Sequence, residues 1–171
     1  TEVSIAVARA AMESGVARKN IEDWDGYKTH LRELMGQESQ LTRQLYDTAR
    51  RHPQRVVFAE GGHPNMLKAA VEAKAEGICH PIILGNEERI EKLAKELDLS
   101  LEGIEIVNLR HDREAERRER YAQILSQKRA REGATYDEAN DKMFERNYFG
   151  MMMVETGDAD AFITGLYTKY S

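Results

Sequence analysis

Short apolar segments alternate with helical patterns after residue 54, and this alternation constrains the fold more than any other feature of the sequence. The apolar segments cover residues 56–59, 81–84 and 104–107, and apolar residues at helical spacing occupy 64–75 and 87–97 between them. Strands that alternate with helices form a parallel sheet with right-handed crossovers. We therefore predict an α/β fold in which a parallel sheet of short strands is wrapped by helices.

Local signals place the ends of several helices. Pro64 suits a first helical turn because its missing N–H would have no partner there, and Asn86 is a favourable N-cap. Thr135 and Glu138 form a capping box, which predicts a new helix after a long charged helix over residues 112–131. A further helix over 148–155 leads to a fourth strand over 161–164.

The first fifty residues show a different pattern, with helices and no strand. Helices are predicted over residues 3–14, from a cap at Asn20 to an end at Gly36, and over residues 39–51. We place an organisational boundary near Gly36. The chain then divides into residues 1–36, a connecting helix within 37–54, and the α/β region 55–171, so that an all-helical segment precedes the sheet.

The composition limits the class of protein. The 171 residues carry a net charge of -5, and Cys79 is the only cysteine, which excludes an internal disulfide and a cysteine-rich metal site. No apolar run approaches the roughly 20 residues of a bilayer-spanning helix, and the first residues do not resemble a signal peptide. We expect a cytoplasmic protein that does not bind membranes.

Other clusters favour structure over chemistry. The arginines and lysines between residues 110 and 131 are interleaved with glutamates, which is typical of a solvated, ion-paired helix face and not of a nucleic-acid footprint. The five histidines show no paired metal spacing. Met151, Met152 and Met153, with Phe149, are predicted to be core. We therefore expect neither nucleic-acid binding nor a metal site.

Two loops are candidates for ligand binding because they follow strands. Residues 157–165 read GDADAFITG, in which a helix stops at Gly157 and a strand ends at Thr164–Gly165. The first strand ends at Glu60–Gly61 in the same way. Ligands of open α/β sheets lie just outside the carboxyl ends of the strands, and a turn of this kind could cradle a phosphate against the next helix. A tight turn that simply needs glycine is the alternative interpretation.

Three blocks after residue 54 resemble the phosphotransacetylase family. The first covers residues 55–90, with a Glu-Gly loop after the opening strand and an Ile-Leu-Gly turn after the second. The second is Tyr121, followed eight residues later by Arg129 and then by Gly133. The third is GDADAFITG. The order and distances of the blocks make the combination specific, and the resemblance implies an incomplete phosphotransacetylase-like fold.

The segment before residue 40 is similar to the carboxyl end of bacterial malic enzymes, with a small-residue helix, a Gly-Val-Ala turn and a helix that bears Trp24. A malic-enzyme tail followed by a phosphotransacetylase-like region is the layout of the bacterial hybrid malic enzymes. The resemblance implies a parent protein that converts malate to pyruvate and carbon dioxide with NADP and a divalent metal, magnesium or manganese. It also implies a homo-oligomer whose appended domain is regulatory and sensitive to acetyl-CoA.

The resemblance places no catalytic residue in this sequence, because those of both families would lie outside it. Arg129 matches an arginine that contacts coenzyme A phosphate in phosphotransacetylases; the alternative is one more solvated arginine on a charged helix. A small-molecule ligand, acetyl-CoA or phosphate, is expected at six residues: Arg129, Glu60, Gly61, Thr164, Gly165 and Ser171.

Two departures from the phosphotransacetylase family favour regulation over acetyl transfer. Residues 62–65 stand where the family has an acidic-Glu-Arg run. After Gly165 the transferases have a serine-rich loop, whereas residues 166–170 here are bulkier and only Ser171 matches that loop. We therefore expect the chain alone to be inactive. Two alternatives stay open: a piece of a phosphate acetyltransferase, and a non-catalytic assembly module.

Overall fold

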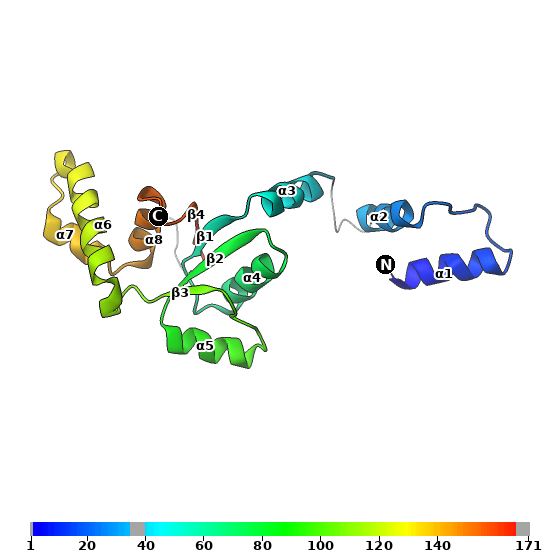
Figure 1. Cartoon of the computed structure of the whole chain (residues 1–171), viewed down its shortest axis with the longest axis horizontal. Coiled ribbons are helices and arrows are strands. Elements are labelled where there is room, and N and C mark those ends of the chain that lie inside the picture. Colours follow the sequence, from blue (N-terminus) through cyan, green and yellow to red (C-terminus); the bar gives the residue numbers. More distant parts are fainter. Residues whose placement is uncertain (1, 35–39, 167–171) are drawn as a thin grey trace. The chain divides into compact units, whose positions relative to one another are not determined.

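The computed structural model describes residues 2–34 and 40–166, which belong to two compact units. The first unit spans residues 1–48 and the second spans residues 49–171. The boundary falls within helix α3 (Gln40–Arg51), so this helix connects the two units (Figure 1).

The first unit contains helices α1 (Glu2–Glu13) and α2 (Trp24–Leu34). The Arg9 guanidinium lies over the Trp24 ring, 4.9 Å from its centroid, so a cation–π contact joins the two helices. Tyr27 packs edge-on against the same ring, with the centroids 6.1 Å apart. The tryptophan thus organises the contact between α1 and α2.

Helix α2 begins later than the sequence predicts. The Asp23 carboxylate accepts a hydrogen bond from the N–H of Gly26 at 2.9 Å, so Asp23 caps a helix that starts at Trp24. The predicted cap at Asn20 is therefore wrong. The predicted helix end at Gly36 lies outside the described residues.

Four parallel strands form the sheet of the second unit. They are β1 (Gln54–Phe58), β2 (Cys79–Leu84), β3 (Glu105–Val107) and β4 (Ala161–Ile163). Their order is β3-β2-β1-β4, and Val57 of β1 is paired with Ile82 on one side and Phe162 on the other. The predicted parallel α/β fold is confirmed.

The sheet changes its direction of growth at β1. The chain moves outward from β1 to β2 and β3, and then returns to place β4 on the opposite side of β1. Such a switch point leaves a crevice outside the carboxyl ends of the two strands, where ligands bind in open α/β sheets. The order of strands therefore selects the ends of β1 and β4 as the first place to look for a site.

Helices cover both faces of the sheet (Figure 1). They are α4 (Pro64–Ala75), α5 (Glu87–Glu96), α6 (Ala115–Lys128), α7 (Tyr136–Lys142) and α8 (Arg146–Glu155). Because side chains alternate along a strand, Phe58 and Ile83 pack in a core with α4 and α5, whereas Val57 and Ile82 pack in a second core with α6, α7 and α8.

The methionine prediction is correct for two of the three residues. Met152 and Met153 are buried in the core under α8, together with Phe149, whereas Met151 is 47% exposed. A helix that covers a sheet buries only one stripe, so three consecutive residues cannot all face the core.

Local signals for helix ends are mostly confirmed. Helix α4 begins at Pro64, and Asn86 Oδ1 accepts from the N–H of Arg89 at 2.9 Å at the start of α5. The N–H of Glu138 donates to Thr135 Oγ1 at 3.2 Å, and the N–H of Thr135 donates to Glu138 Oε2 at 3.0 Å. This reciprocal capping box begins α7.

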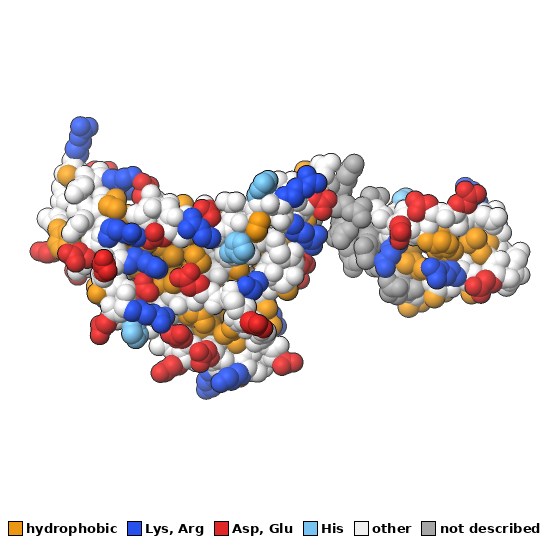
Figure 2. Space-filling model, viewed as in Figure 1, with side chains coloured by type: hydrophobic (Ala, Val, Ile, Leu, Met, Phe, Trp, Pro, Cys, Tyr) orange, Lys and Arg blue, Asp and Glu red, His pale blue; other side chains and the backbone are white. Residues whose placement is uncertain are grey.

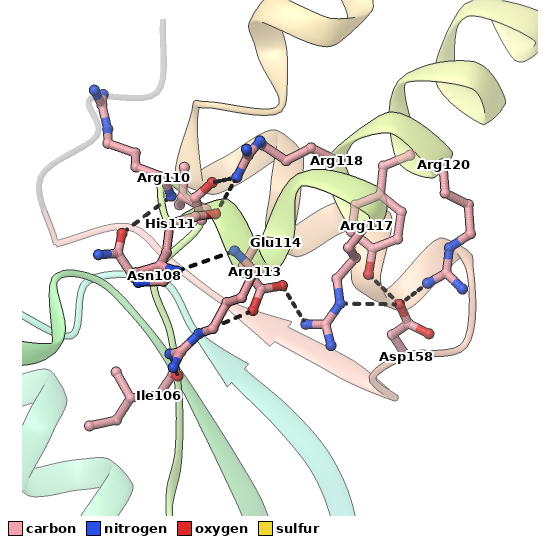
Figure 3. Close-up of polar contacts among 12 residues, drawn as sticks. Ile106, Asn108, Arg110, His111, Arg113, Glu114, Arg117, Arg118, Arg120 and Asp158 are labelled. Atoms are coloured by element: carbon pink, nitrogen blue, oxygen red, sulfur yellow. Dashed lines mark hydrogen bonds and ion pairs between the residues drawn. The ribbon is translucent and has the colours of Figure 1, made fainter.

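The predicted charged helix over residues 112–131 is shorter than expected, with a 3₁₀ turn at each end. A 3₁₀ turn, η1 (Asp112–Glu114), precedes α6, and a second, η2 (Ala130–Glu132), follows it. Arg118 is only 8% exposed and donates to the carbonyls of Leu109 and His111 at 2.6 and 2.9 Å. The prediction of a solvated face is therefore wrong for Arg118, which anchors the chain between β3 and α6 (Figure 3).

Candidate functional site

The carboxyl ends of β1 and β4 meet at the side chain of Glu60. Thr164 Oγ1 lies 2.9 Å from Glu60 Oε1, and the N–H of Gly165 donates to the same oxygen at 3.1 Å. Gly61 follows in the chain, and its N–H donates to the Leu84 carbonyl at the end of β2 at 3.2 Å. Four of the six residues predicted to bind a ligand are thus brought together at the switch point.

Gly61 is required by close packing. A Cβ atom at this position would lie 2.1 Å from Ile83 Cγ2 and 2.9 Å from the Leu84 carbonyl oxygen. Any side chain would push β1 and β2 apart at their ends. The interpretation of a tight turn that needs glycine therefore accounts for Gly61, while Gly62 has open space around it and lines a hollow.

Glu60 is a buried carboxylate with one satisfied oxygen. Its residue exposure is 2%, and Oε2 has no hydrogen-bond partner among the described residues. The Thr164 hydroxyl, which has one proton to donate, also lies 2.9 Å from Asn147 Oδ1 on α8. A buried carboxylate with one oxygen that lacks a hydrogen bond lowers the stability of the folded state. Such a group therefore indicates a role other than stability.

A cleft of about 780 Å³ opens beside Glu60. Its size falls within the roughly 300–1,000 Å³ of sites that hold small molecules. The walls come from the ends of β1, β2 and β3 and from the start of α8. Its polar side chains include Glu60, Asn86, Arg89, Arg110, Arg146 and Asn147.

Arg89 and Arg146 were not predicted as ligand-binding residues, and Arg110 was expected on a solvated, ion-paired helix face. Arg89 lies in the first turn of α5, Arg110 follows β3, and Arg146 is the first residue of α8. Applying the strand-end rule to β2 and β3, as well as to β1 and β4, would have pointed to Arg89 and Arg110. Arg146 had no such signal, because α8 reaches the cleft through tertiary packing.

Of the other two predicted binding residues, Arg129 and Ser171, the structure describes only Arg129. Arg129 caps the end of α6, where its guanidinium donates to Glu132 at 2.7 Å and the side chain is 60% exposed. That hydrogen bond raises the pKa of Arg129. Arg129 does not line the cleft, so its contact with a ligand stays a prediction. Ser171 lies outside the described residues.

The two aspartates of GDADAFITG have structural partners at the opposite, amino end of β4. Asp158 accepts hydrogen bonds from the Tyr121 hydroxyl and from Arg120, and Arg117 Nε lies 4.0 Å from it; Figure 3 shows both arginines pointing toward this carboxylate. Burial, followed by the hydrogen bond to Asp158, raises the pKa of Tyr121 to about 12. Asp158 therefore ties α6 to the turn before β4.

Asp160 connects β4 to the start of β1. Its carboxylate accepts from Arg55 Nη2 at 2.8 Å, from Nε at 3.1 Å and from the backbone N–H at 2.8 Å. The side-chain and then the backbone hydrogen bonds of Arg55 lower the pKa of Asp160 to about 2. This pair fixes how β4 aligns with β1, and hence brings Thr164 level with Glu60.

A second hollow, of about 610 Å³, lies along the first turns of α6. Its arginines already have carboxylate partners: Arg113 pairs with Glu87 at 3.2 Å, and Arg117 pairs with Glu114 at 3.3 Å. Figure 2 likewise shows acidic and basic side chains interspersed on one face of the surface. Among the described residues, the arginines of the hollow along α6 are therefore all paired with carboxylates, in contrast to those of the cleft beside Glu60.

The described residues hold no group of three or more His, Cys, Asp or Glu side chains that could bind a metal ion. None of the described helices is long and apolar enough to cross a membrane.

The chain is similar to two groups of known proteins. Residues 40–171 match the phosphate acetyl/butaryl transferase family. A phosphate acetyltransferase from Synechocystis sp. is 36% identical over 124 residues, which cover 71% of this chain and 17% of that protein. The crystal structure of a phosphotransacetylase from Streptococcus pyogenes is similar with a TM-score of 0.63 at 28% identity, covering 77% of this chain and 40% of that one.

A second group of relatives matches almost the whole chain. The NADP-dependent malic enzyme of Rhizobium meliloti is 35% identical over 172 residues, and that of Escherichia coli is 35% identical over 175 residues. Each match covers 99% of this chain and 22% of the relative, so the chain spans about a fifth of the length of these malic enzymes. The resemblance to both groups, stated from the sequence, is confirmed: this chain belongs to the phosphate acetyl/butaryl transferase family and is similar along nearly its whole length to NADP-dependent malic enzymes.

Proposed function

We propose that this chain is the phosphotransacetylase-like part of an NADP-dependent malic enzyme and that it binds acetyl-CoA or phosphate as a regulatory ligand. One observation carries the proposal: Glu60, Thr164 and Gly165 meet at the switch point of the sheet, beside a cleft of about 780 Å³. In an open α/β sheet this is where a ligand binds. The parent protein would convert malate to pyruvate and carbon dioxide in the cytoplasm, as a homo-oligomer, with NADP and magnesium or manganese held elsewhere.

A regulatory role fits the site better than acetyl transfer. The described lining of the cleft has arginines, amides and two glutamates, but no Ser, Thr, Cys or His that could form a nucleophile–base pair. The residues at 62–65 also depart from the run found in the transferases. We therefore propose that the chain binds its ligand without turning it over.

Thermal unfolding in the presence of acetyl-CoA and, separately, of inorganic phosphate tests this function. A ligand that binds only the folded state stabilises it by RT ln(1 + [L]/Kd), which is about 2.7 kcal/mol at about 100 times Kd. The melting temperature should rise with acetyl-CoA concentration in the unmodified chain and rise less in Glu60→Gln, which disturbs the junction. Glu102→Gln, an exposed change on a distant loop, serves as the control.

The outcomes separate the candidate functions. Phosphate-dependent formation of acetyl-CoA by the chain would contradict a regulatory role and indicate a transferase, which the similarity to a phosphate acetyltransferase makes the second candidate. Self-association without any ligand-induced change in melting temperature would indicate an assembly module instead.

A further inference from the structure

We infer that Arg89 and Arg146 form an anion subsite of this cleft, which holds a phosphate group of a phosphorylated small molecule. The inference rests on the proposed function for the identity of the ligand, and on the geometry alone for the position of the anion. It assigns the phosphate to residues other than Arg129.

The two arginines face shared open space. Arg89 and Arg146 both line the cleft of about 780 Å³ and an adjoining hollow of about 340 Å³, which also share Gly85 and Asn86. They come from different helices, α5 and α8, so the fold brings them together although they are far apart in the sequence. Arg110 adds a third guanidinium to the larger cleft, and in Figure 3 its side chain points away from the cluster around Asp158.

These guanidinium groups have no ion-pair partner in the part of the chain that the structure describes. Among the described residues, no carboxylate lies within ion-pair distance of Arg89, Arg110 or Arg146, whereas neighbouring arginines such as Arg113 and Arg117 are paired. Guanidinium binds phosphate through two parallel N–H donors, and several unpaired groups around one cleft concentrate positive potential there.

The backbone adds to the positive potential. Helix α8 has ten residues, no acidic side chain in its first turn and no side-chain hydrogen bond at its cap. Its amino end therefore presents uncapped N–H groups and the positive end of the helix dipole at the cleft.

A second polar feature marks the same cleft as a ligand site. The Glu60 side chain is buried, and its Oε2 atom has no partner among the described residues. Gly165 and Thr164 contact Oε1, so the negative charge of the Glu60 carboxylate is partly compensated. In addition, the three arginines of the lining outnumber its two acidic side chains, Glu60 and Glu145. The cleft as a whole favours an anion.

Calorimetric titration with inorganic pyrophosphate and with acetyl-CoA tests the inference. Dissociation constants are measured for the unmodified chain, Arg89→Ala and Arg146→Ala. Arg131→Ala is the matched control, since Arg131 is an exposed arginine outside the cleft with no ion-pair partner in the described part of the chain. Arg129→Ala tests the rival position. All of these side chains are exposed, and circular dichroism confirms that each variant folds.

We expect Arg89→Ala and Arg146→Ala each to raise the dissociation constant for pyrophosphate at least tenfold, and Arg131→Ala to change it less than twofold. Unchanged binding in both cleft variants, a loss confined to Arg129→Ala, or no pyrophosphate binding by the unmodified chain would overturn the inference. Acetyl-CoA binding that is insensitive to both cleft arginines would leave the proposed function standing and refute the subsite. Pyrophosphate binding through these arginines, without binding of acetyl-CoA or of inorganic phosphate, would support the subsite and contradict the proposed function.

Discussion

Replacing Gly150 by alanine tests how tightly α8 is packed on β4. A Cβ atom at Gly150 would lie 2.2 Å from Phe162 Cε2 and 2.6 Å from Cδ2, well inside van der Waals contact. Gly150 is buried in the middle of α8, and Phe162 lies in β4, two residues before Thr164. The substitution therefore forces the ring, and with it the strand that leads into the candidate site, to move.

The magnitude follows from two opposing terms. Inserting a methyl group into a packed core costs about 1–3 kcal/mol, whereas alanine is favoured over glycine inside a helix by about 1 kcal/mol. We expect Gly150→Ala to lower the free energy of unfolding by about 1 kcal/mol. In a Phe162→Leu background the ring is absent, so the same change should stabilise the protein by up to about 1 kcal/mol.

Urea denaturation followed by circular dichroism measures both legs of this double-mutant cycle. A coupling of about 2 kcal/mol between the two positions is expected. If Gly150→Ala stabilises the unmodified protein, or if its effect is the same in both backgrounds, then α8 is not held against β4 by this contact and the reasoning is refuted.

Three further predictions concern individual hydrogen bonds. Because the pKa of Tyr121 is raised to about 12, its contribution to the free energy of unfolding should be complete below about pH 10 and be lost as the pH rises toward 12. Urea unfolding across this pH range should show a steep loss of stability, which Tyr121→Phe reduces. Equal dependence of stability on pH in the two proteins would contradict this prediction. Because Arg55 lowers the pKa of Asp160 to about 2, the contribution of Asp160 to the free energy of unfolding is present above about pH 4 and is lost as the pH falls toward 2. Asp160→Asn should therefore be less stable than the unmodified protein at neutral pH, and its stability should depend less on acid. Thr135→Ala should cost about 1 kcal/mol and increase hydrogen exchange in α7, whereas Thr135→Ser should change little; equal exchange in the two variants would contradict a capping role.

The fold was predictable because its signals are local. Alternating apolar segments identified the strands, and Pro64, Asn86 and Thr135 marked helix starts that the structure confirms. The cap of α2 was misplaced because two residues, Asn20 and Asp23, suit the same role, and only the geometry of the turn selects the aspartate.

The site was predictable only in part. Glu60 and Thr164 follow strands, and a rule about strand ends finds them without knowing how the strands pair. Arg118 was expected to be solvated because helical spacing alone cannot reveal that a buried guanidinium holds two loop carbonyls. Likewise, Arg89 and Arg146 lie far apart in the sequence, and only the packing of α5 and α8 around the sheet brings them to one cleft.

Hydrogen exchange measured with and without acetyl-CoA tests the central claim most directly, because it locates the ligand as well as detecting it. If the ligand binds at the switch point of the sheet, protection should rise at the backbone N–H groups of 60–65, 85–90 and 145–149, and the segment around Arg129 should change little. Protection confined to residues 126–134, or no protection anywhere at saturating acetyl-CoA, would contradict the account.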